Sequence, residues 1–574
     1  MDSLRAGIQK TQHHLRQVHT QASGSQPARL SKFPASSRVG WQQVCHKQHG
    51  ATGQGADRRT GTPHAKGPHQ SQLQSRTAAR RLGAGASRQP QAGDCPSHPE
   101  RSNHRTGQVG RERSGTNSQI HWTASFEHLR GSGKFHHETG GPPAMSKPTG
   151  LLSPRGETGW TSRDATHLLW RTQFGASAHE IKRATTEGLA KTVNRLLKDQ
   201  PETEEFRTVE PLLRSAALDS GNIDNLKAWW LHRMHYTANP LRERLALFWH
   251  NHFATSNDKV NDVAAMAAQN DLLRRESLGS FRRLLHGMAK DPAMLIWLDG
   301  NANRKRHANE NFAREVMELF SLGEGNYSET DIKQAARAFT GWHVRKGQFW
   351  FNRAQHDFTD KTLFGVTRNL DGSDVVELCL AHKSCPRFLA FKLLRAFVLE
   401  QPTAAQVGAL AARIREHNFE MTPIMRKLLT SKLFYSPTNR HALIKSPLQL
   451  VLGAFRALGG RPDLSKVAPL LAQLGQDIMA PPTVKGWEGG RLWITSATLL
   501  QRNNFAAALL SNQLGRIDTS RGVVDQFAEL LLARDLPASR KRLAGYLKEA
   551  EGDPEERLRG VLHLITTMPE YQLT

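Results

Sequence analysis

The sequence predicts a mainly α-helical body made of one large domain, with one small β-hairpin inserted near residues 347–365 and a disordered N-terminal tail. Three observations support this prediction. Apolar residues recur at helical spacing from Ser162 onward, signals typical of helix starts precede many of these stretches, and residues 1–144 lack apolar periodicity. The 574 residues are enough for several hydrophobic cores, and no repeat of fixed period indicates a solenoid.

Residues 1–144 are rich in Gln, His, Ser, Gly, Arg and Thr, and we expect a disordered basic tail. They hold 20 Lys and Arg against 7 Asp and Glu, a net charge of +13 out of +26. Such an arm can bind nucleic acid by releasing counterions. The alternative is a misassigned start, because Met145 begins a plausible short entry to the body. We expect a linker at 145–160 and a single helical domain at 161–574.

The body is only mildly basic, because its 58 Lys and Arg face 45 Asp and Glu, also +13, over about three times the length of the tail. This balance argues against nucleic acid as a partner of the body. The four cysteines, Cys45, Cys95, Cys379 and Cys385, are too few for a disulfide scaffold and lack zinc-ligand spacing. No apolar run of 18 residues predicts a membrane span, and no secretory signal is found, so we expect a cytoplasmic location by default.

Helix-start signals organise the first half of the body. Ser177 and Glu180 have the spacing of a capping box, in which each side chain caps the backbone amide of the other residue. Pro240 follows Asn239 at a first-turn position, where its missing N–H costs nothing. Gly175 can end the first helix. The helices expected on this basis span about 162–174, 177–197, 222–236, 239–249, 258–275, 277–290 and 292–298.

The central stretch, residues 299–323, joins an Asn-rich loop to a short helix that ends near Leu322. Ser328 with Asp331 opens the next helix, which ends near Gly341. Aromatic residues then alternate with polar ones in Gln348-Phe-Trp-Phe-Asn352, which predicts the hairpin. Helical spacing resumes near 374 and continues to the C-terminus, apart from a glycine-rich loop at 484–490.

The central helix supplies two catalytic candidates, Glu310 and Glu315. Its carboxylates and Arg314 have the i, i+4 spacing of ordinary surface ion pairs, including Arg314 with Glu318. If the helix is buried, however, each carboxylate needs a polar partner, and the neighbouring loop can provide it. We assign positioning or structural roles to the other polar residues of the stretch: Asp299, Asn309 (the expected N-cap), Asn311, Arg314 and Glu318.

Two histidines, His250 and His252, are candidate metal ligands. On a helix, side chains at i and i+2 point about 200° apart and cannot share one metal ion. On an extended backbone they share a face and can chelate. Simple packing among their aromatic neighbours is the other interpretation, and the spacing leaves these alternatives open.

Adjacent His356 and Asp357 are candidates for general acid–base catalysis or metal binding, with a solvated turn as the equal alternative. Lys361, Lys485 and Trp487 are expected to position a ligand or the loops around it. The glycines of 484–490 permit positive φ and close backbone approach, but no nucleotide-binding motif is present.

Seven stretches of the body resemble a known family. They are HLLWRTQFG (167–175), RERLALFWHNHFATS (242–256), MAKDPAMLIWLDG (288–300), NENFAREVMELFSLGEGNYSETDIKQAARAFTGW (309–342), HDFTDKTLFG (356–365), IKSPLQLVLGAFRALG (444–459) and PPTVKGWEGGRLWI (481–494). They are similar to the bacterial family called domain of unknown function 1800. The resemblance implies a largely helical fold without an established activity. It also implies export as an alternative location, and a sulfatase-like partner encoded nearby. The family has HD-x-G-x-K at the hairpin loop, whereas this chain has Thr359 in place of the glycine.

Two functions remain open. The first is a metal-assisted hydrolase, in which a polar site around 299–318 uses carboxylates and imidazoles as general bases or as ligands of a divalent metal ion. The second is a non-catalytic helical scaffold, or partner of a sulfatase-like protein, whose polar residues form a structural network between loop 299–309 and the hairpin. Convergence of both histidine segments on the central helix, around an open cleft, would favour the first.

Overall fold

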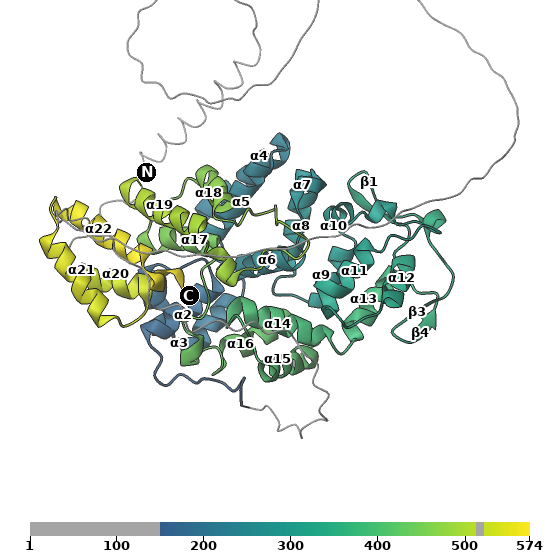
Figure 1. Cartoon of the computed structure of the whole chain (residues 1–574), viewed down its shortest axis with the longest axis horizontal. Coiled ribbons are helices and arrows are strands. Elements are labelled where there is room, and N and C mark those ends of the chain that lie inside the picture. The colour runs from purple at the N-terminus through teal and green to yellow at the C-terminus, as the bar shows by residue number, and fades with distance from the viewer. Residues whose placement is uncertain (1–149, 513–521) are drawn as a thin grey trace, which may run out of the picture. The chain divides into compact units, whose positions relative to one another are not determined.

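The computed structural model describes residues 150–512 and 522–574, which form a mainly helical body with two small antiparallel hairpins (Figure 1). The predicted mainly α class is therefore confirmed. The predicted disordered tail, residues 1–144, lies outside the described residues. None of the helices within the described ranges is long and apolar enough to cross a membrane.

The first helices follow the predicted start signals closely. The Ser177–Glu180 capping box forms, with the Ser177 amide donating to Glu180 Oε2 at 2.8 Å. The first helix ends three residues before Gly175, and a Cβ on that glycine would lie 2.9 Å from the Gly453 carbonyl oxygen. Gly175 therefore permits a close chain crossing. The helices are α2 (Ser162–Thr172), α3 (Ala178–Leu197), α4 (Glu204–Ser220), α5 (Ile223–Tyr236), α6 (Pro240–His252), α7 (Asn257–Val260), α8 (Val263–Arg275), α9 (Phe281–Ala289) and α10 (Pro292–Trp297).

The middle of the chain contains two hairpins where the sequence predicted one. Strand β1 pairs with β2 and β3 with β4, over the range 342–368. Both connections, Lys346-Gly347 and Phe364-Gly365, have positive φ at two successive residues, as two-residue hairpin turns of type I′ require. The elements are α11 (Asn311–Met317), a π-helical turn η2 (Glu318–Leu322), α12 (Glu329–Ala338), β1 (Trp342–Arg345), β2 (Gln348–Phe351), β3 (Lys361–Leu363) and β4 (Val366–Arg368).

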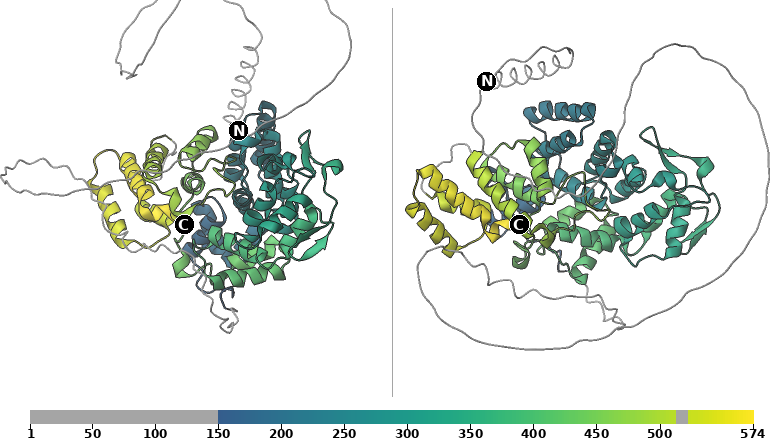
Figure 2. Two further views of the ribbon diagram at one scale, coloured as in Figure 1. Left: turned by 45° about the vertical axis from the view of Figure 1, so that its right-hand side comes forward. Right: turned by 45° about the horizontal axis from the view of Figure 1, so that its top comes forward.

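The remaining helices place α14 at the middle of the body. Figures 1 and 2 show α20–α22 at one end and the hairpins at the other, with α6 and α14 between them. These helices are α13 (Gly372–Ala381), α14 (Cys385–Phe397), α15 (Ala404–Glu416), α16 (Met421–Leu429), α17 (Pro447–Leu458), α18 (Leu464–Gln473), α19 (Ser496–Asn512), α20 (Val523–Leu532), α21 (Pro537–Glu549) and α22 (Pro554–Thr567).

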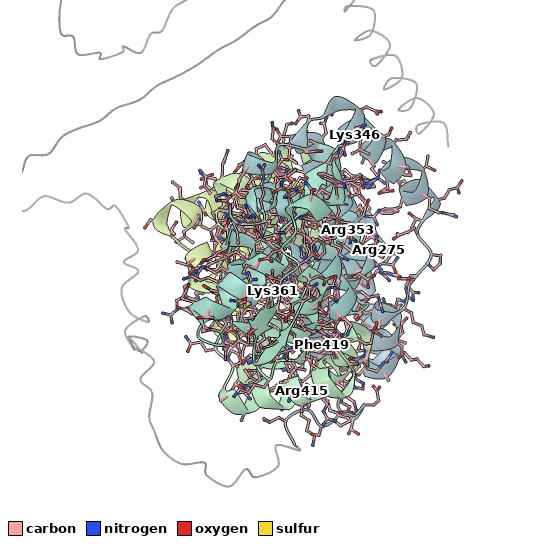
Figure 3. All side chains as sticks on the ribbon, turned by 90° about the vertical axis from the view of Figure 1, so that its right-hand side faces the viewer. Arg275, Lys346, Arg353, Lys361, Arg415 and Phe419 are labelled. Atoms are coloured by element: carbon pink, nitrogen blue, oxygen red, sulfur yellow. The ribbon has the colours of Figure 1, made fainter. Side chains whose placement is uncertain are left out.

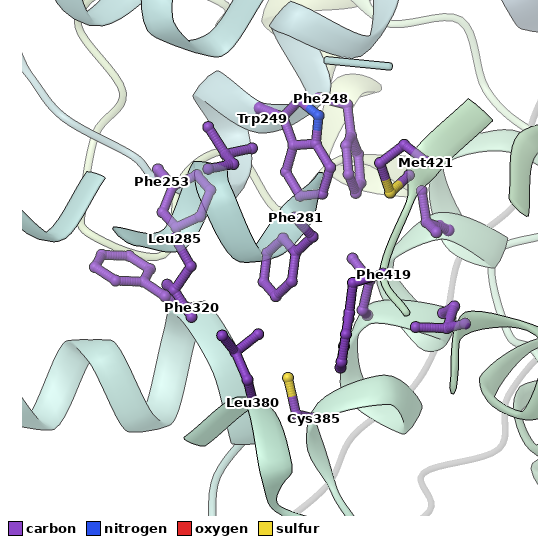
Figure 4. Packing of buried hydrophobic residues seen from close by; sticks show 14 of the residues in the cluster. Phe248, Trp249, Phe253, Phe281, Leu285, Phe320, Leu380, Cys385, Phe419 and Met421 are labelled. Atoms are coloured by element: carbon purple, nitrogen blue, oxygen red, sulfur yellow. The ribbon is translucent and has the colours of Figure 1, made fainter. Parts of the chain in front are cut away.

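An aromatic cluster packs the end of α6 against its neighbours. Trp249 stacks on Phe281 of α9, with ring centroids 5.5 Å apart, and Phe253 contacts Phe320 of η2 at 5.2 Å (Figure 4). All four rings are buried. Large buried aromatic faces contribute strongly to packing energy, so α6, α9 and η2 are held as one unit.

Buried Arg171 joins distant segments through its guanidinium group. Its Nη1 donates to the carbonyl oxygens of Phe397 and Val398, both at 2.8 Å. Its Nη2 donates to those of Asn439 at 2.7 Å and Thr574 at 2.8 Å. Helix α2, the end of α14 and the C-terminal residue are therefore tied together at the centre of the body, where Figure 1 marks the C-terminus beside α2.

Glu243 anchors the start of α6 from inside the protein. Arg274 Nε donates to it at 2.6 Å, Arg233 Nε at 3.1 Å and Trp230 Nε1 at 3.0 Å. Burial alone would raise the pKa of Glu243, but the two guanidinium groups outweigh burial and lower the pKa to about 2. The orientation of α6 therefore depends on a buried carboxylate that stays ionised.

We predict that Glu243→Gln lowers the free energy of unfolding by about 3 kcal/mol, because it removes the buried carboxylate that buried Arg274 and half-buried Arg233 share. The ionised carboxylate stabilises the fold above its unfolded pKa, near 4.5, and this contribution is lost as pH falls toward 2. Urea denaturation across this pH range measures both effects, and the variant should lack that part of the acid sensitivity. Glu329→Gln, which removes an exposed partner of Arg314, is the control. Equal losses in the two variants would contradict the prediction.

Candidate functional site

A cleft of about 470 Å³ opens between α6, α14 and the loop 484–493. Helix α6 lines it with Arg244, Leu247, Phe248 and Asn251, the i, i+3, i+4, i+7 spacing of one helical face. This volume is within the range of small-molecule binding sites. The cleft is therefore the best candidate for a ligand site among the described residues.

Helix α14 lines the cleft along its length. Phe388, Lys392 and Arg395 lie on one face at i, i+4, i+7 spacing, and Glu400 follows just beyond the helix. The Lys392 ammonium group lies 5.3 Å from the centroid of the Phe388 ring. The ring face supplies a favourable cation–π contact, but no hydrogen-bond acceptor.

Asn251 holds the 484–493 loop against α6. Its Oδ1 accepts from the Trp487 amide at 2.7 Å and its Nδ2 donates to the Trp487 carbonyl at 3.1 Å. The side-chain amide thus pairs with the loop as another backbone would. The loop can approach so closely because residue 486 is glycine, with φ of +78°. A Cβ at Gly486 would lie 2.5 Å from the Asn251 carbonyl oxygen and still closer to Oδ1.

Eight charged side chains line the cleft. The cations are Arg244, Lys392, Arg395 and Lys485, and the anions are Glu318, Glu324, Glu400 and Glu488. Within residues 150–512 and 522–574, none of the eight is in an ion pair, although many other charges of the body are. Glu324, Lys485 and Glu488 are exposed, but the other five are half-buried. Unpaired charge is costly to place in a partly buried position, so the concentration of these five needs a reason other than stability.

Burial lowers the pKa of two cations in this cleft, Lys392 and Arg244. Burial, followed by the neighbouring Arg395 charge, lowers the pKa of Lys392 to about 8. Burial also lowers the pKa of Arg244 to about 10. Arg244 donates only weakly to the Ala396 carbonyl, at 3.4 Å, and its Nε is buried without a hydrogen-bond partner. Both groups would gain from an anion in the cleft.

Glu318 belongs to another wall of the cleft, and Glu315 lies behind it, outside the lining but close enough for the Glu318 charge to raise its pKa. Glu318 accepts a hydrogen bond from the Tyr327 hydroxyl at 2.5 Å. Burial and the neighbouring Glu318 charge raise the pKa of Glu315, whereas Lys485 and Arg314 lower it by less. The environment therefore favours the protonated form of Glu315 more than water does.

His250 and His252 are both helical, because α6 continues to His252. They point to different partners: His250 Nε2 accepts from the Met479 amide at 3.1 Å, and His252 Nε2 donates to the Phe320 carbonyl at 3.0 Å. The extended backbone that chelation would need is absent. Burial lowers the pKa of His250 to about 4, and burial with the Lys392 charge lowers that of His252 to about 3. The described residues contain no group of three or more His, Cys, Asp or Glu side chains placed to hold a metal ion.

His356 and Asp357 form a separate network beside the hairpins, which also includes Lys361, labelled in Figure 3. His356 Nδ1 donates to the Thr340 carbonyl at 2.7 Å, and Arg337 Nε donates to Asp357 Oδ2 at 2.8 Å. Burial would raise the pKa of Asp357, but hydrogen bonds from Thr359 and Arg337 hold it well below its ordinary value. Buried Lys361 donates to the Thr359 carbonyl at 2.9 Å. Thr359 thus contributes to the network through both its side chain and its carbonyl oxygen.

The Asn-rich loop is joined to the same region. Asn303 Nδ2 donates to the Ala336 carbonyl at 2.9 Å, and its own carbonyl accepts from the Gly341 amide at 3.1 Å and from His343 Nε2 at 3.2 Å. Asn303 Oδ1 accepts from the Asn309 amide at 3.0 Å. These contacts match the structural network that the scaffold interpretation expects between loop 299–309 and the hairpin.

The other polar residues of the central stretch have local partners. Asp299 pairs with Lys259 at 2.8 Å. Asn309 Oδ1 accepts from the Asn311 amide at 2.9 Å, although the helix begins one residue later than predicted, with Glu310 as its N-cap.

Arg314 and Asn311, on the central helix, also have partners close by. Arg314 pairs with Glu329 at 2.8 Å and with Glu310 at 3.5 Å, whereas its predicted partner Glu318 binds Tyr327. Asn311 Nδ2 donates to the Leu298 carbonyl at 3.4 Å.

Three of the residues singled out from the sequence, Glu318, Lys485 and Trp487, line the cleft. Sequence reasoning missed its most distinctive members, which are Arg244, Asn251, Lys392 and Arg395. One sequence signal could have found them. In both helices, charged or amide side chains lie within one or two turns of aromatic residues, on a face that is otherwise apolar.

We predict that Gly486→Ala releases the loop 484–493, because the added methyl group meets Asn251. Gly475→Ala is a matched control, since Gly475 also has positive φ but an added Cβ meets nothing within 4 Å. Trypsin cleavage after Lys485, followed by mass spectrometry, should be about tenfold faster in Gly486→Ala than in the control, because proteolysis concentrates in exposed, mobile loops. Equal cleavage rates would show that Asn251 does not hold the loop.

Comparison with known proteins gives a family for this chain. No curated protein and no solved structure gives a match. Residues 167–573 match the family model described as "Protein of unknown function (DUF1800)", a range that starts within α2 and includes every residue that lines the cleft. The chain therefore belongs to the DUF1800 family.

Proposed function

We propose that the protein binds a small polar ligand in the cleft between α6, α14 and the 484–493 loop, and hydrolyses it by general acid–base catalysis. The observation that carries this proposal is the half-buried carboxyl group of Glu315, whose pKa is raised, beside Glu318, which lines an open cleft and accepts a hydrogen bond from the Tyr327 hydroxyl. A carboxyl group with a raised pKa next to a second carboxyl group at a cleft is typical of acid–base catalysis.

The environments suggest a role for each carboxyl group. Glu315, whose pKa is raised, keeps its proton nearer to neutral pH and can give it to a leaving group. Glu318 accepts the Tyr327 hydroxyl hydrogen bond and lines the cleft, where its carboxyl group can accept a proton from an attacking water molecule. Asn251 and Gly486 position the loop that carries Trp487 over the ligand.

This proposal differs in two respects from a metal-assisted hydrolase built on both histidine segments. His250 and His252 are engaged with backbone groups, and the described residues hold no cluster of three metal-binding side chains. The proposed acid and base are Glu315 of α11 and Glu318 of η2. His356 and Asp357 therefore have no catalytic role in this proposal.

A structural role is the second candidate for the hairpin region. Asn303, His356, Asp357 and Lys361 have their polar groups engaged in the network of loop 299–309, which favours a scaffold function for this part of the chain. A sulfatase-like partner stays a prediction that rests on family resemblance.

We predict that the full chain hydrolyses at least one member of a panel of p-nitrophenyl carboxylate, phosphate and glycoside substrates at neutral pH. Glu315→Gln should lower that rate by about 100-fold, a typical contribution of a positioned general acid. The wild-type rate should fall as pH rises through the raised pKa of Glu315, because only the protonated form donates, and the variant should lack this limb.

Glu310→Gln is the matched control, since Glu310 is on the same helix but pairs with Arg314. Its rate should stay within about twofold of the wild type, as expected of a surface ion pair. The proposal fails if no substrate is hydrolysed, or if Glu315→Gln and Glu310→Gln have the same rate.

A further inference from the structure

One end of the cleft is strongly cationic. Lys392 and Arg395 lie at i, i+3 on one face of α14, and the Arg395 charge is close enough to lower the pKa of Lys392. Arg244 reaches the same turn from α6, where it donates to the Ala396 carbonyl and lies over the Phe397 ring at 5.2 Å. Three cations from two helices therefore meet around residues 392–397.

These cations have no anionic partner of their own. In the described ranges, no ion pair involves Arg244, Lys392 or Arg395, and Lys392 has a ring face rather than an acceptor beside its ammonium group. Buried Arg274 pairs with Glu243, and buried Arg171 donates to four backbone oxygen atoms. Lys445 is also buried and has no ion pair among the described residues, but it lines a cavity of only about 20 Å³. The cleft cations differ because they face a cavity large enough for a ligand.

We propose that Arg244, Lys392 and Arg395 form a binding subsite for the anionic group, carboxylate or phosphate, of the small molecule that enters the cleft. The inference deepens the proposed function by naming the substrate class. Guanidinium and ammonium groups are the usual partners of both anions, and fixed cations in a partly buried cleft bind them more strongly than at an open surface.

The subsite also explains where the anion must enter. Glu318 of η2, Glu324 just after it and Glu488 of the loop line the same cleft and repel an anion, whereas the three cations come from α6 and α14, so the charged group is directed toward these two helices. Gly490 lies so close to the Glu400 carboxylate that a Cβ there would overlap it, which keeps this acid near the loop. A bound ligand therefore has its anionic group at Lys392 and its hydroxyl or ammonium groups toward the glutamates.

Calorimetry with the full chain tests this proposal directly. Inorganic phosphate or acetate is titrated at constant ionic strength, with sodium chloride as the control for simple screening. We expect saturable binding of at least one of the two anions, and at least tenfold weaker binding in Lys392→Met. Arg387→Met removes a cation from the same helix outside the cleft and should change binding less than twofold. Whichever anion binds more tightly identifies the ligand as a carboxylate or a phosphate compound.

Thermal unfolding is a second measurement, and it distinguishes a lost binding site from a variant that does not fold. Lys392→Met removes an unpaired, partly buried charge, so its melting temperature should rise by a few degrees while anion binding is lost. The bound anion should raise the melting temperature of the wild type and not of Lys392→Met.

The outcomes separate this inference from the proposed hydrolysis. Glu315→Gln should bind the anion as well as the wild type does, even if its activity is lost. The subsite proposal is overturned if neither anion binds, if chloride has the same effect, or if Lys392→Met and Arg387→Met bind equally. Anion binding without hydrolysis would sink only the acid–base proposal.

Discussion

The two hydrogen bonds between the Asn251 side chain and the backbone of Trp487 are the contact on which the candidate site depends. They attach a loop 236 residues away in sequence to the C-terminal end of α6. Gly486 makes this approach possible, and the buried Glu243 carboxylate fixes the helix that presents Asn251. If the loop were free, the cleft would lose one of its walls, and the charges around it would be exposed to water and worth far less to a ligand.

Polar residues in this body are of two kinds, and hydrogen-bond satisfaction separates them. Around the hairpins, Asn303, His356 and Asp357 have nearby partners for their polar groups, as buried structural polar groups generally do. In the cleft, Arg244 and Lys392 are charged, partly buried and without an anionic partner. Proteins keep such unfavourable arrangements chiefly where a ligand compensates them, which is why the cleft, and not the hairpin network, carries the functional proposal.

Much of the fold could be predicted because its signals are local. Ser177 with Glu180 formed the expected capping box, and the glycines of 484–490 marked a loop of close backbone approach. The hairpin prediction was incomplete, because the turn at Lys346-Gly347 requires positive φ at a lysine, which composition does not reveal. The end of α6 decided the geometry of the two histidines, and helix ends are the least predictable feature of a sequence.

The cleft itself could not be predicted, because its cations come from helices about 150 residues apart. Within its own helix, each cation is at a position typical of the polar face of an ordinary amphipathic helix. Only the tertiary packing brings Arg244 and Lys392 to the same cleft.

The central claim is that α6 and the 484–493 loop form one preformed site, and amide hydrogen exchange at Trp487 tests it most directly. Asn251 accepts the hydrogen bond of this amide, so mass spectrometry should find it protected by orders of magnitude in the full chain. In Asn251→Ala the protection should disappear, while the amides of α14 keep theirs. Exchange of the wild-type Trp487 amide at the rate of an unstructured peptide would contradict the account.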